Sequence, residues 1–203
     1  MLDKQLQSKN IKLLGISYYP RQVLWSTQTL VTLDNLKGRK IRVTTAEQAE
    51  FARRMGAIPV TIDTPEVSSA LQRGIVSAVL TASSGGGRIW HDLLKYNLRT
   101  GPNYVCVIFI ANNTNFEKLS PDLRERVSAL GRKAAAGLTT LLHQNEDVLT
   151  ASFAKEGMTV TPGTDGDTTR ISETMHSYWA EWAKSRGPEA QDLLTKLLAV
   201  LGR

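Results

Sequence analysis

The first half of the chain alternates between two hydrophobic periods. Short β-branched runs are separated by segments whose apolar residues recur at helical spacing and end at glycines. The predicted strands span residues 11–19, 40–44, 58–62 and 75–82, and the predicted helices span 46–55 and 66–73. This order of strand and helix is typical of an α/β unit with a largely parallel sheet.

Helical periodicity dominates the second half of the chain. After a glycine-rich turn, SSGGG at 83–87, the pattern predicts a helix at 88–96 and an apolar strand at 103–111 that suits burial on both faces. A capping Ser120, a proline and early acidic residues open one very long helix that ends at Gly157. Its glycines at 131 and 137 are candidate bends. A short strand at 158–163 and helices at 167–186 and 188–201 complete the pattern.

Bulk properties narrow the class of protein. The hydrophobic content of 41% supports a substantial core, whereas the longest apolar run has only the length of a strand. Residues 1–10 are polar and lack the apolar segment of a secretory signal. The net charge of +6 suits an anionic ligand. Because the cations are dispersed and not interleaved with aromatic residues, we expect no nucleic-acid partner.

Residues that could support catalysis or metal binding do not form a known constellation. The three histidines, His91, His143 and His176, lie on predicted helices, outside any nucleophile elbow, and form only pairs with neighbouring acids. The glycine-rich turn lacks the lysine of a phosphate loop. The single Cys106 lies inside an apolar run and is predicted to be a buried structural thiol. We therefore expect no enzyme, metal or cofactor.

Several short motifs occur together in a fixed order. DNLKGRKIRV ends at Val43, GAIPV spans 56–60, and Glu66-Val67 and ALQRG (70–74) follow. Together they resemble the dicarboxylate-binding receptor family of tripartite ATP-independent periplasmic (TRAP) transporters, and the likeness covers nearly the whole chain. The resemblance implies an α/β, periplasmic-binding-protein-like fold, a class II-type clamshell with a long spanning helix and C-terminal helices.

The resemblance also implies a set of ligand-binding residues. The family clamps a ligand carboxylate with an arginine on the K-x-R-V strand, and the residue that matches it is Arg42, whose guanidinium fork suits a carboxylate. The neighbouring Arg39 and Lys40 have no such counterpart and are expected on an exposed turn. The other candidates stand at strand ends or in the loops that follow them: Thr81, Ser83, either Asn112 or Asn113, and either Arg21 or Gln22.

Two departures from the family pattern bear on function. The rim that follows Thr81 reads Ala82-Ser83-Ser84-Gly85, which puts the usual ligand preference in question. By the resemblance, family members begin with a long first-lobe segment, and we expect that segment to be missing ahead of the strand at residue 11. The expected parts are a lead-in and hinge strand (1–19), a second α/β lobe (20–105), a remnant of the first lobe with the long helix (106–157), and a returning strand with C-terminal helices (158–203).

These departures lead to two hypotheses. The first is an extracytoplasmic TRAP receptor, or a truncated remnant of one, that binds a small organic acid, works with a membrane permease and lies in the periplasm. The second is a structural module that kept the fold, lost transport and oligomerises. In either case, exposed sheet edges and apolar surfaces favour a homodimer that completes the missing lobe.

Overall fold

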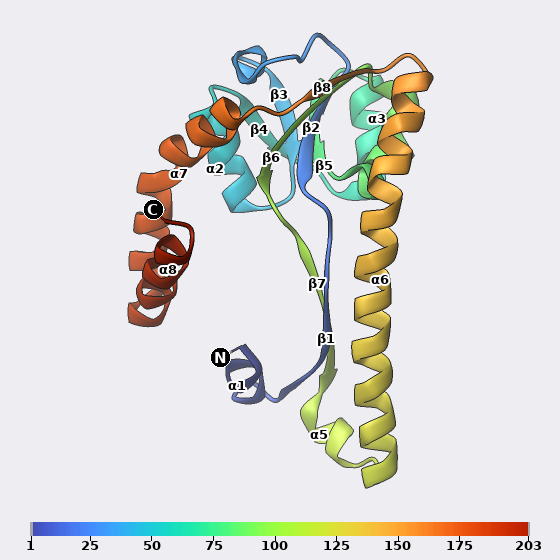
Figure 1. The fold of residues 1–203 in the computed structure, drawn as a ribbon, viewed down its shortest axis with the longest axis vertical. Helices are drawn as coiled ribbons and strands as arrows, with labels where there is room; N and C mark the ends of the chain where they lie inside the picture. The colour runs from blue at the N-terminus through green and yellow to red at the C-terminus, as the bar shows by residue number, and fades with distance from the viewer. Residues whose placement is uncertain (1, 203) are drawn as a thin grey trace.

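Six strands form a mixed sheet at one end of the molecule (Figure 1). The computed structural model describes residues 2–202. The strand order is β4-β3-β5-β2-β6-β8. The strands are β2 (Gln22–Ser26), β3 (Lys40–Val43), β4 (Ile58–Thr61), β5 (Ala78–Thr81), β6 (Tyr96–Asn103) and β8 (Thr159–Pro162).

The sheet is parallel only in part. Strand β3 pairs in parallel with β4 and β5, as the strand–helix–strand pattern predicts. Strand β2, which the pattern did not predict, lies antiparallel to both β5 and β6 and makes the sheet mixed. All five residues of β2 are buried, so its sequence, QVLWS, lacks the alternation that marks a half-buried strand.

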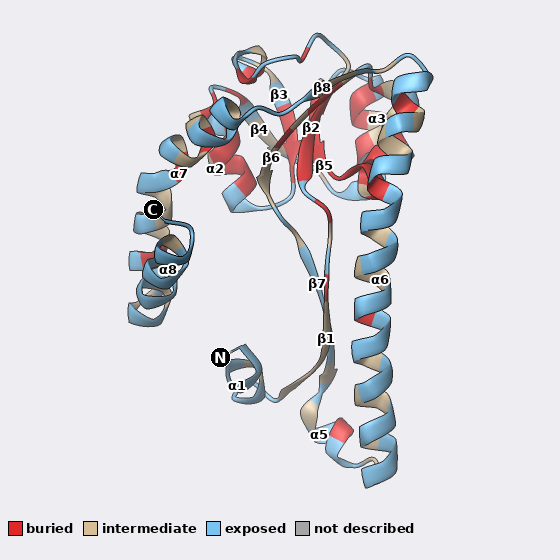
Figure 2. Cartoon of the chain, viewed as in Figure 1, coloured by how far each residue is buried: buried red, intermediate tan, exposed pale blue. Residues whose placement is uncertain are grey.

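Helices cover both faces of this sheet. Side chains alternate across β2: Leu24 packs in one core cluster, and Val23 and Trp25 pack in the other. The Leu24 cluster contains residues of α2 (Ala46–Arg54) and α7 (Asp165–Arg186). The Trp25 cluster contains residues of α3 (Val67–Gln72), α4 (Arg88–Trp90) and the end of α6 (Pro121–Lys155). Buried residues accordingly gather around the sheet (Figure 2).

The predicted long helix is confirmed as α6, which runs from the sheet to the opposite end of the molecule (Figure 1). Ser120 caps it by accepting a hydrogen bond from the amide of Leu123. Gly131 allows close approach to the neighbouring strand, because a Cβ at this position would lie 2.8 Å from the Cβ of Leu14. The C-terminal helices are confirmed as α7 and α8 (Pro188–Val200).

Beside α6, a two-stranded antiparallel ribbon extends away from the sheet. It consists of β1 (Ile11–Tyr18) and β7 (Cys106–Asn112). The prediction that the 103–111 strand is buried on both faces was wrong, because β7 pairs only with β1 and has no buried residue. The prediction of a buried Cys106 was wrong for the same reason, since its side chain is exposed.

The predicted helix at 88–96 is much shorter in the structure. Helix α4 is followed by a 3-10 turn at His91–Leu93, and the chain then enters β6 at Tyr96. The apolar spacing of 88–96 is helical, but Tyr96 to Asn103 add a strand to the open edge of β2. Short helices that the pattern did not predict are α1 (Leu2–Gln7) and α5 (Asn113–Glu117). Among residues 2–202, no helix combines the length and apolar character needed to cross a membrane.

Candidate functional site

A cavity of about 660 Å³ lies between strand ends of the sheet and the sheet-proximal half of α6. Strands β3 and β5, the turn at 83–87 and α4 contribute one wall, and α6 contributes the other. Leucines 138, 141, 142 and 149 make the α6 wall largely apolar. The polar residues of the lining include Gln22, Arg42, Thr44, Thr64, Thr81, Ser84, Arg88 and Asn145.

Arg42 is the charged residue buried in this wall. Strand alternation directs Ile41 and Val43 into the core cluster around α2 and turns Arg42 to the other face. The Arg42 side chain is only 3% exposed. Its guanidinium lies 5.4 Å from the ring centre of Trp90, a geometry that permits a cation–π contact.

Two hydrogen bonds fix the orientation of this guanidinium. Nε of Arg42 donates to the carbonyl of Ile62 at 2.9 Å, and Nη2 donates to the hydroxyl of Thr64 at 3.0 Å. Burial lowers the pKa of Arg42, and the nearby carboxylate of Asp63 opposes that shift. An arginine remains protonated at neutral pH under such a shift. The site therefore presents an oriented positive charge at the cavity wall.

No carboxylate of residues 2–202 forms an ion pair with Arg42. Two of its five N–H donors bond to the protein, which leaves donors for a bound group. Asp63 favours the charged form of Arg42 from nearby but forms no ion pair with it, and a buried charge is costly without a bonded partner. An anion that enters the cavity would supply the missing partner.

Two further predicted residues share the cavity with Arg42. Thr81 is buried at the end of β5, where its hydroxyl oxygen accepts the amide of Gly86 at 2.9 Å. Its hydroxyl proton stays available to donate to a ligand. Gln22, also buried, donates through Nε2 to the carbonyl of Pro20 at 3.3 Å. Arg42, Thr81 and Gln22 thus come from three strands to one cavity.

The other predicted residues lie elsewhere. Arg21 points to the surface, where Nε donates to the hydroxyl of Tyr104 at 3.0 Å. Asn112 caps α5 at the far end of the ribbon, with Asn113 beside it, and neither lines the cavity. Ser83 is fully buried behind the cavity wall, and its amide donates to Glu146.

Sequence reasoning missed part of the wall. Trp90 lies in both the core and the cavity lining. Strand β4 pairs in parallel with β3, so the two strands end at the same edge of the sheet. Thr64 follows β4 and is therefore a polar residue that the sequence could have indicated. The wall from α6 carries no such signal, since it depends on where a helix distant in sequence packs.

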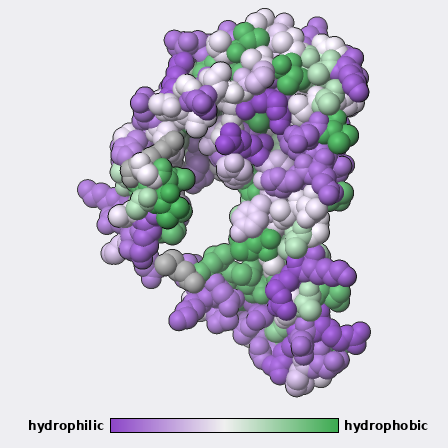
Figure 3. Space-filling view, in the orientation of Figure 1, coloured by the Kyte–Doolittle hydropathy of each residue, from purple (hydrophilic) through white to green (hydrophobic). Residues whose placement is uncertain are grey.

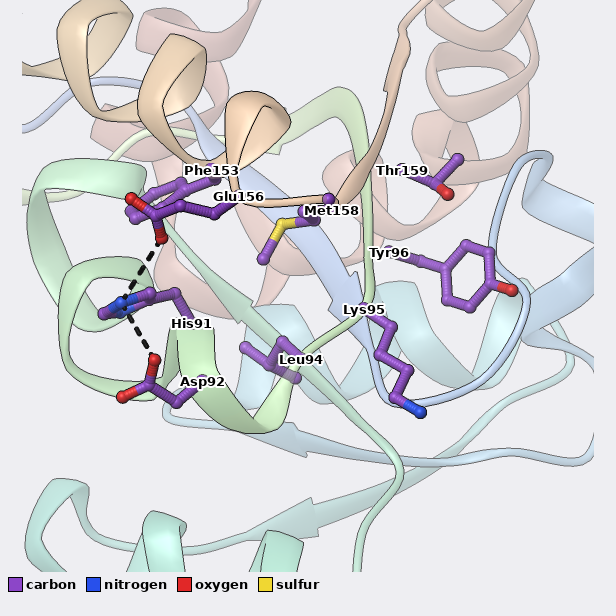
Figure 4. A pocket seen from close by; sticks show the side chains of 10 residues that line it. His91, Asp92, Leu94, Lys95, Tyr96, Phe153, Glu156, Met158 and Thr159 are labelled. Atoms are coloured by element: carbon purple, nitrogen blue, oxygen red, sulfur yellow. Dashed lines mark ion pairs between the residues drawn. The ribbon is translucent and has the colours of Figure 1, made fainter.

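A second cavity, of about 460 Å³, lies near the C-terminal end of α6 (Figure 4). His91 stands between two acids there, with Nε2 at 3.2 Å from Asp92 and 3.8 Å from Glu156. The imidazole stacks on the ring of Phe153 at 5.2 Å. None of the predicted ligand residues lines this cavity. Within residues 2–202, no group of three or more His, Cys, Asp or Glu side chains is placed to hold a metal ion.

Comparison with known proteins connects the fold to one family. Residues 1–185 match the family described as bacterial extracellular solute-binding protein, family 7. A solute-binding protein of Sulfitobacter is 29% identical over 136 residues. A Bordetella pertussis extracytoplasmic solute receptor that binds pyroglutamic acid is 28% identical, with a TM-score of 0.87. A TRAP solute-binding protein of Desulfovibrio salexigens with bound orotic acid shares the fold, at 21% identity and a TM-score of 0.85.

The matches cover the relatives unequally. The alignments cover 96% of this chain but 65% of the Bordetella receptor and 63% of the Desulfovibrio protein. The match to the Sulfitobacter protein covers 66% of this chain and 41% of that protein. A Haemophilus influenzae relative, 25% identical, is covered to 49%. The chain thus spans about two thirds of the solved receptors and half or less of the curated relatives.

Proposed function

The chain belongs to family 7 of the bacterial extracellular solute-binding proteins, and from this premise we propose that it is a TRAP-transporter receptor, or part of one, that binds a small organic acid. The carboxylate of that acid bonds to the free donors of Arg42. The observation that carries this proposal is a buried, oriented guanidinium in a cavity wall with no carboxylate partner among the described residues.

The cavity supports a small ligand with an apolar body. A bidentate guanidinium–carboxylate pair is short and directional, and exclusion of water strengthens it. Thr81 and Gln22 supply hydrogen-bonding groups beside Arg42, and the leucines of α6 supply the apolar side. Ser83 lies behind the wall, and Arg21, Asn112 and Asn113 lie outside the cavity, so the proposal does not depend on them.

The relatives suggest which acids to test first. The Bordetella receptor binds pyroglutamic acid, and solved structures of the same fold hold orotic acid or malonate. Each of these molecules carries a carboxylate attached to a small body, which matches the combination of Arg42 and an apolar wall. In this role the chain lies in the periplasm and delivers its ligand to the membrane permease of the transporter.

Thermal unfolding in the presence of a panel of small carboxylates tests the proposal. A ligand at a hundred times its Kd stabilises the folded state by about 2.7 kcal/mol, so a true ligand raises Tm. Arg42→Ala should weaken binding by at least about 30-fold, because it removes the charged partner of the carboxylate. Arg73→Ala, on the exposed end of α3, serves as the matched control and should leave affinity unchanged.

Two results would overturn the receptor function for this chain. One is a panel in which no acid raises Tm. The other is a stabilising acid whose affinity is the same for wild type and Arg42→Ala. Arg42→Lys sharpens the interpretation, since an ammonium keeps the charge but loses the fork that suits a carboxylate.

A second candidate is an oligomerising structural module derived from the same fold. The observation that favours it is apolar surface on the ribbon, where Val107, Ile108 and Ile110 are exposed, and along the opening between the ribbon and α8 (Figure 3). Pairing of two copies would bury this surface. Light scattering after size-exclusion chromatography distinguishes monomer from dimer, and a monomer at high concentration would exclude this candidate.

A further inference from the structure

One carboxylate ties the long helix to the turn at 83–87. Glu146 projects from α6, and its side chain is 8% exposed. Its Oε1 accepts the amide of Ser83 at 3.0 Å and Nη2 of Arg99 at 3.2 Å. Its Oε2 accepts the amide of Ser84 at 3.0 Å and the hydroxyl of Ser84 at 3.1 Å. Four hydrogen bonds therefore converge on one buried side chain.

The opposite side of this turn faces the cavity. Ser84, Gly85 and Gly86 belong to the cavity lining. The turn is close-packed, since a Cβ on Gly86 would lie 2.2 Å from the ring of Trp90. The amide of Gly86 also bonds to the hydroxyl of Thr81. Any shift of the turn would therefore move the residues that stand beside Arg42.

On the helix side, the same carboxylate stands among cavity residues. Leu142, Asn145 and Leu149 line the cavity from α6, and Glu146 lies between them in sequence. The hydrogen bonds of Glu146 thus join the two opposing walls directly. Hydrogen bonds to a carboxylate are directional, whereas apolar packing is not, so this connection favours one arrangement of the two walls.

The charge of Glu146 is maintained by its partners. Burial raises its pKa, but hydrogen bonds from Ser84, Ser83 and Arg99 outweigh burial and hold the pKa below its ordinary value. Arg99 also donates to the hydroxyl of Ser83 at 3.1 Å. A neutral replacement for Glu146 would leave buried N–H groups with a weaker acceptor or none.

We propose that Glu146 is a positioning residue of the cavity: it holds the turn at 83–87 against α6 and so fixes Thr81 and Ser84 beside Arg42. Glu146 does not itself touch the ligand, because its carboxylate lies behind the turn. The effect on ligand affinity rests on the proposed function, whereas the effect on the turn does not.

Amide hydrogen exchange without ligand tests the positioning role directly. In Glu146→Gln, the amides of Ser83, Ser84 and Gly86 should exchange at least about 10-fold faster, because loss of about 1.4 kcal/mol of local stability has that effect. The amide of Leu24, inside the sheet, should not change. Equal acceleration at all these amides would indicate general destabilisation and would overturn the proposal, as would no acceleration at all.

Two further variants keep the test decisive. Glu146→Asp retains the charge but is shorter by one methylene, and it should free the turn even if Glu146→Gln does not fold. Glu125→Gln makes the same chemical change at an exposed position of the same helix and should leave the turn unchanged. If Glu146→Asp protects the turn as well as wild type does, the proposal fails.

The pH profile of wild type supplies an independent readout. A carboxylate with a lowered folded-state pKa contributes its stabilisation fully above its unfolded-state pKa and loses it as pH falls through the folded-state pKa. Protection of the Ser83 and Ser84 amides should therefore fall on acidification in wild type and in Glu125→Gln. Glu146→Gln has no carboxylate there and should show no such step; the same acid step in Glu146→Gln would overturn the assignment.

Calorimetric titration with pyroglutamate, the ligand of the Bordetella relative, tests the consequence for binding. If wild type binds it, Glu146→Gln and Glu146→Asp should weaken affinity about 10-fold or more, because small displacements of positioned groups are costly. Unchanged affinity would show that the turn is not needed for binding and would overturn the positioning role. If wild type does not bind pyroglutamate, this acid is not a ligand and the proposed function fails for pyroglutamate. The exchange experiment still decides whether Glu146 holds the turn.

Discussion

The sheet body and the ribbon have similar apolar strands but very different burial. Here the sheet body means the six-stranded sheet with α2, α3, α4, α7 and the adjoining end of α6, and the ribbon means β1 and β7. Strand β2 is buried at all five residues, whereas β7 has none buried (Figure 2). Strand β2 has neighbours on both edges and helices on both faces. Burial therefore depends on tertiary neighbours more than on the hydrophobicity of a strand.

Hydrogen exchange should reveal the largest contrast between the two regions. Amides of β2 lie in the interior of the sheet body and should open only with global unfolding, whereas bonded amides of β7 open when the ribbon separates locally. We expect protection factors at least about a thousand-fold lower in β7, a difference of about 4 kcal/mol. Mass spectrometry of peptides from each strand measures this, and equal protection would show that the two regions unfold as one unit.

Paired truncations should separate the regions in stability. Leu24→Ala in β2 removes a fully buried side chain and should cost about 3 kcal/mol. Ile108→Ala in β7 removes a side chain that is 39% exposed and should cost less than about 1 kcal/mol. Urea unfolding followed by circular dichroism measures both. A cost for Ile108→Ala as large as that for Leu24→Ala would mean that a second copy covers the ribbon.

The sequence predicted those elements whose signals are local. Ser120 caps α6 as its pattern indicates, Thr45 caps α2, and β3 and β4 form at the predicted places. Strand β2 was missed because a short, fully buried run has no period to detect. The burial of Cys106 was mispredicted because an apolar run does not indicate whether other elements of the fold pack over it.

The same distinction applies to the site. Arg42, Thr81 and Gln22 lie on strands of the sheet body, and all three line one cavity. The wall from α6 and the connection through Glu146 depend on a packing partner more than 40 residues away in sequence. Such contacts leave no local pattern.

Two glycines of α6 test whether the ribbon is held by close packing. Gly131→Ala would place a Cβ 2.8 Å from Leu14, and such overpacking should cost about 1–2 kcal/mol. Gly137→Ala is the matched control, because a Cβ added there would meet no packing neighbour of the helix within 4 Å and alanine favours the helix by about 0.5–1 kcal/mol. Chemical denaturation should thus give opposite signs. A stabilising Gly131→Ala would mean that β1 does not press on α6.

The smallest effect is expected at Cys106, at the start of β7. Because this thiol is exposed and is the only one in the chain, a thiol reagent should label native protein at nearly the rate seen in urea. Cys106→Ser should change the free energy of unfolding by less than about 0.5 kcal/mol, since an exposed position away from the core tolerates a polar oxygen. Labelling followed by mass spectrometry checks the first expectation. If labelling requires unfolding, the start of the ribbon is covered in solution. Labelling of diluted protein would then show whether a second copy covers it, because dissociation of a dimer exposes the thiol again.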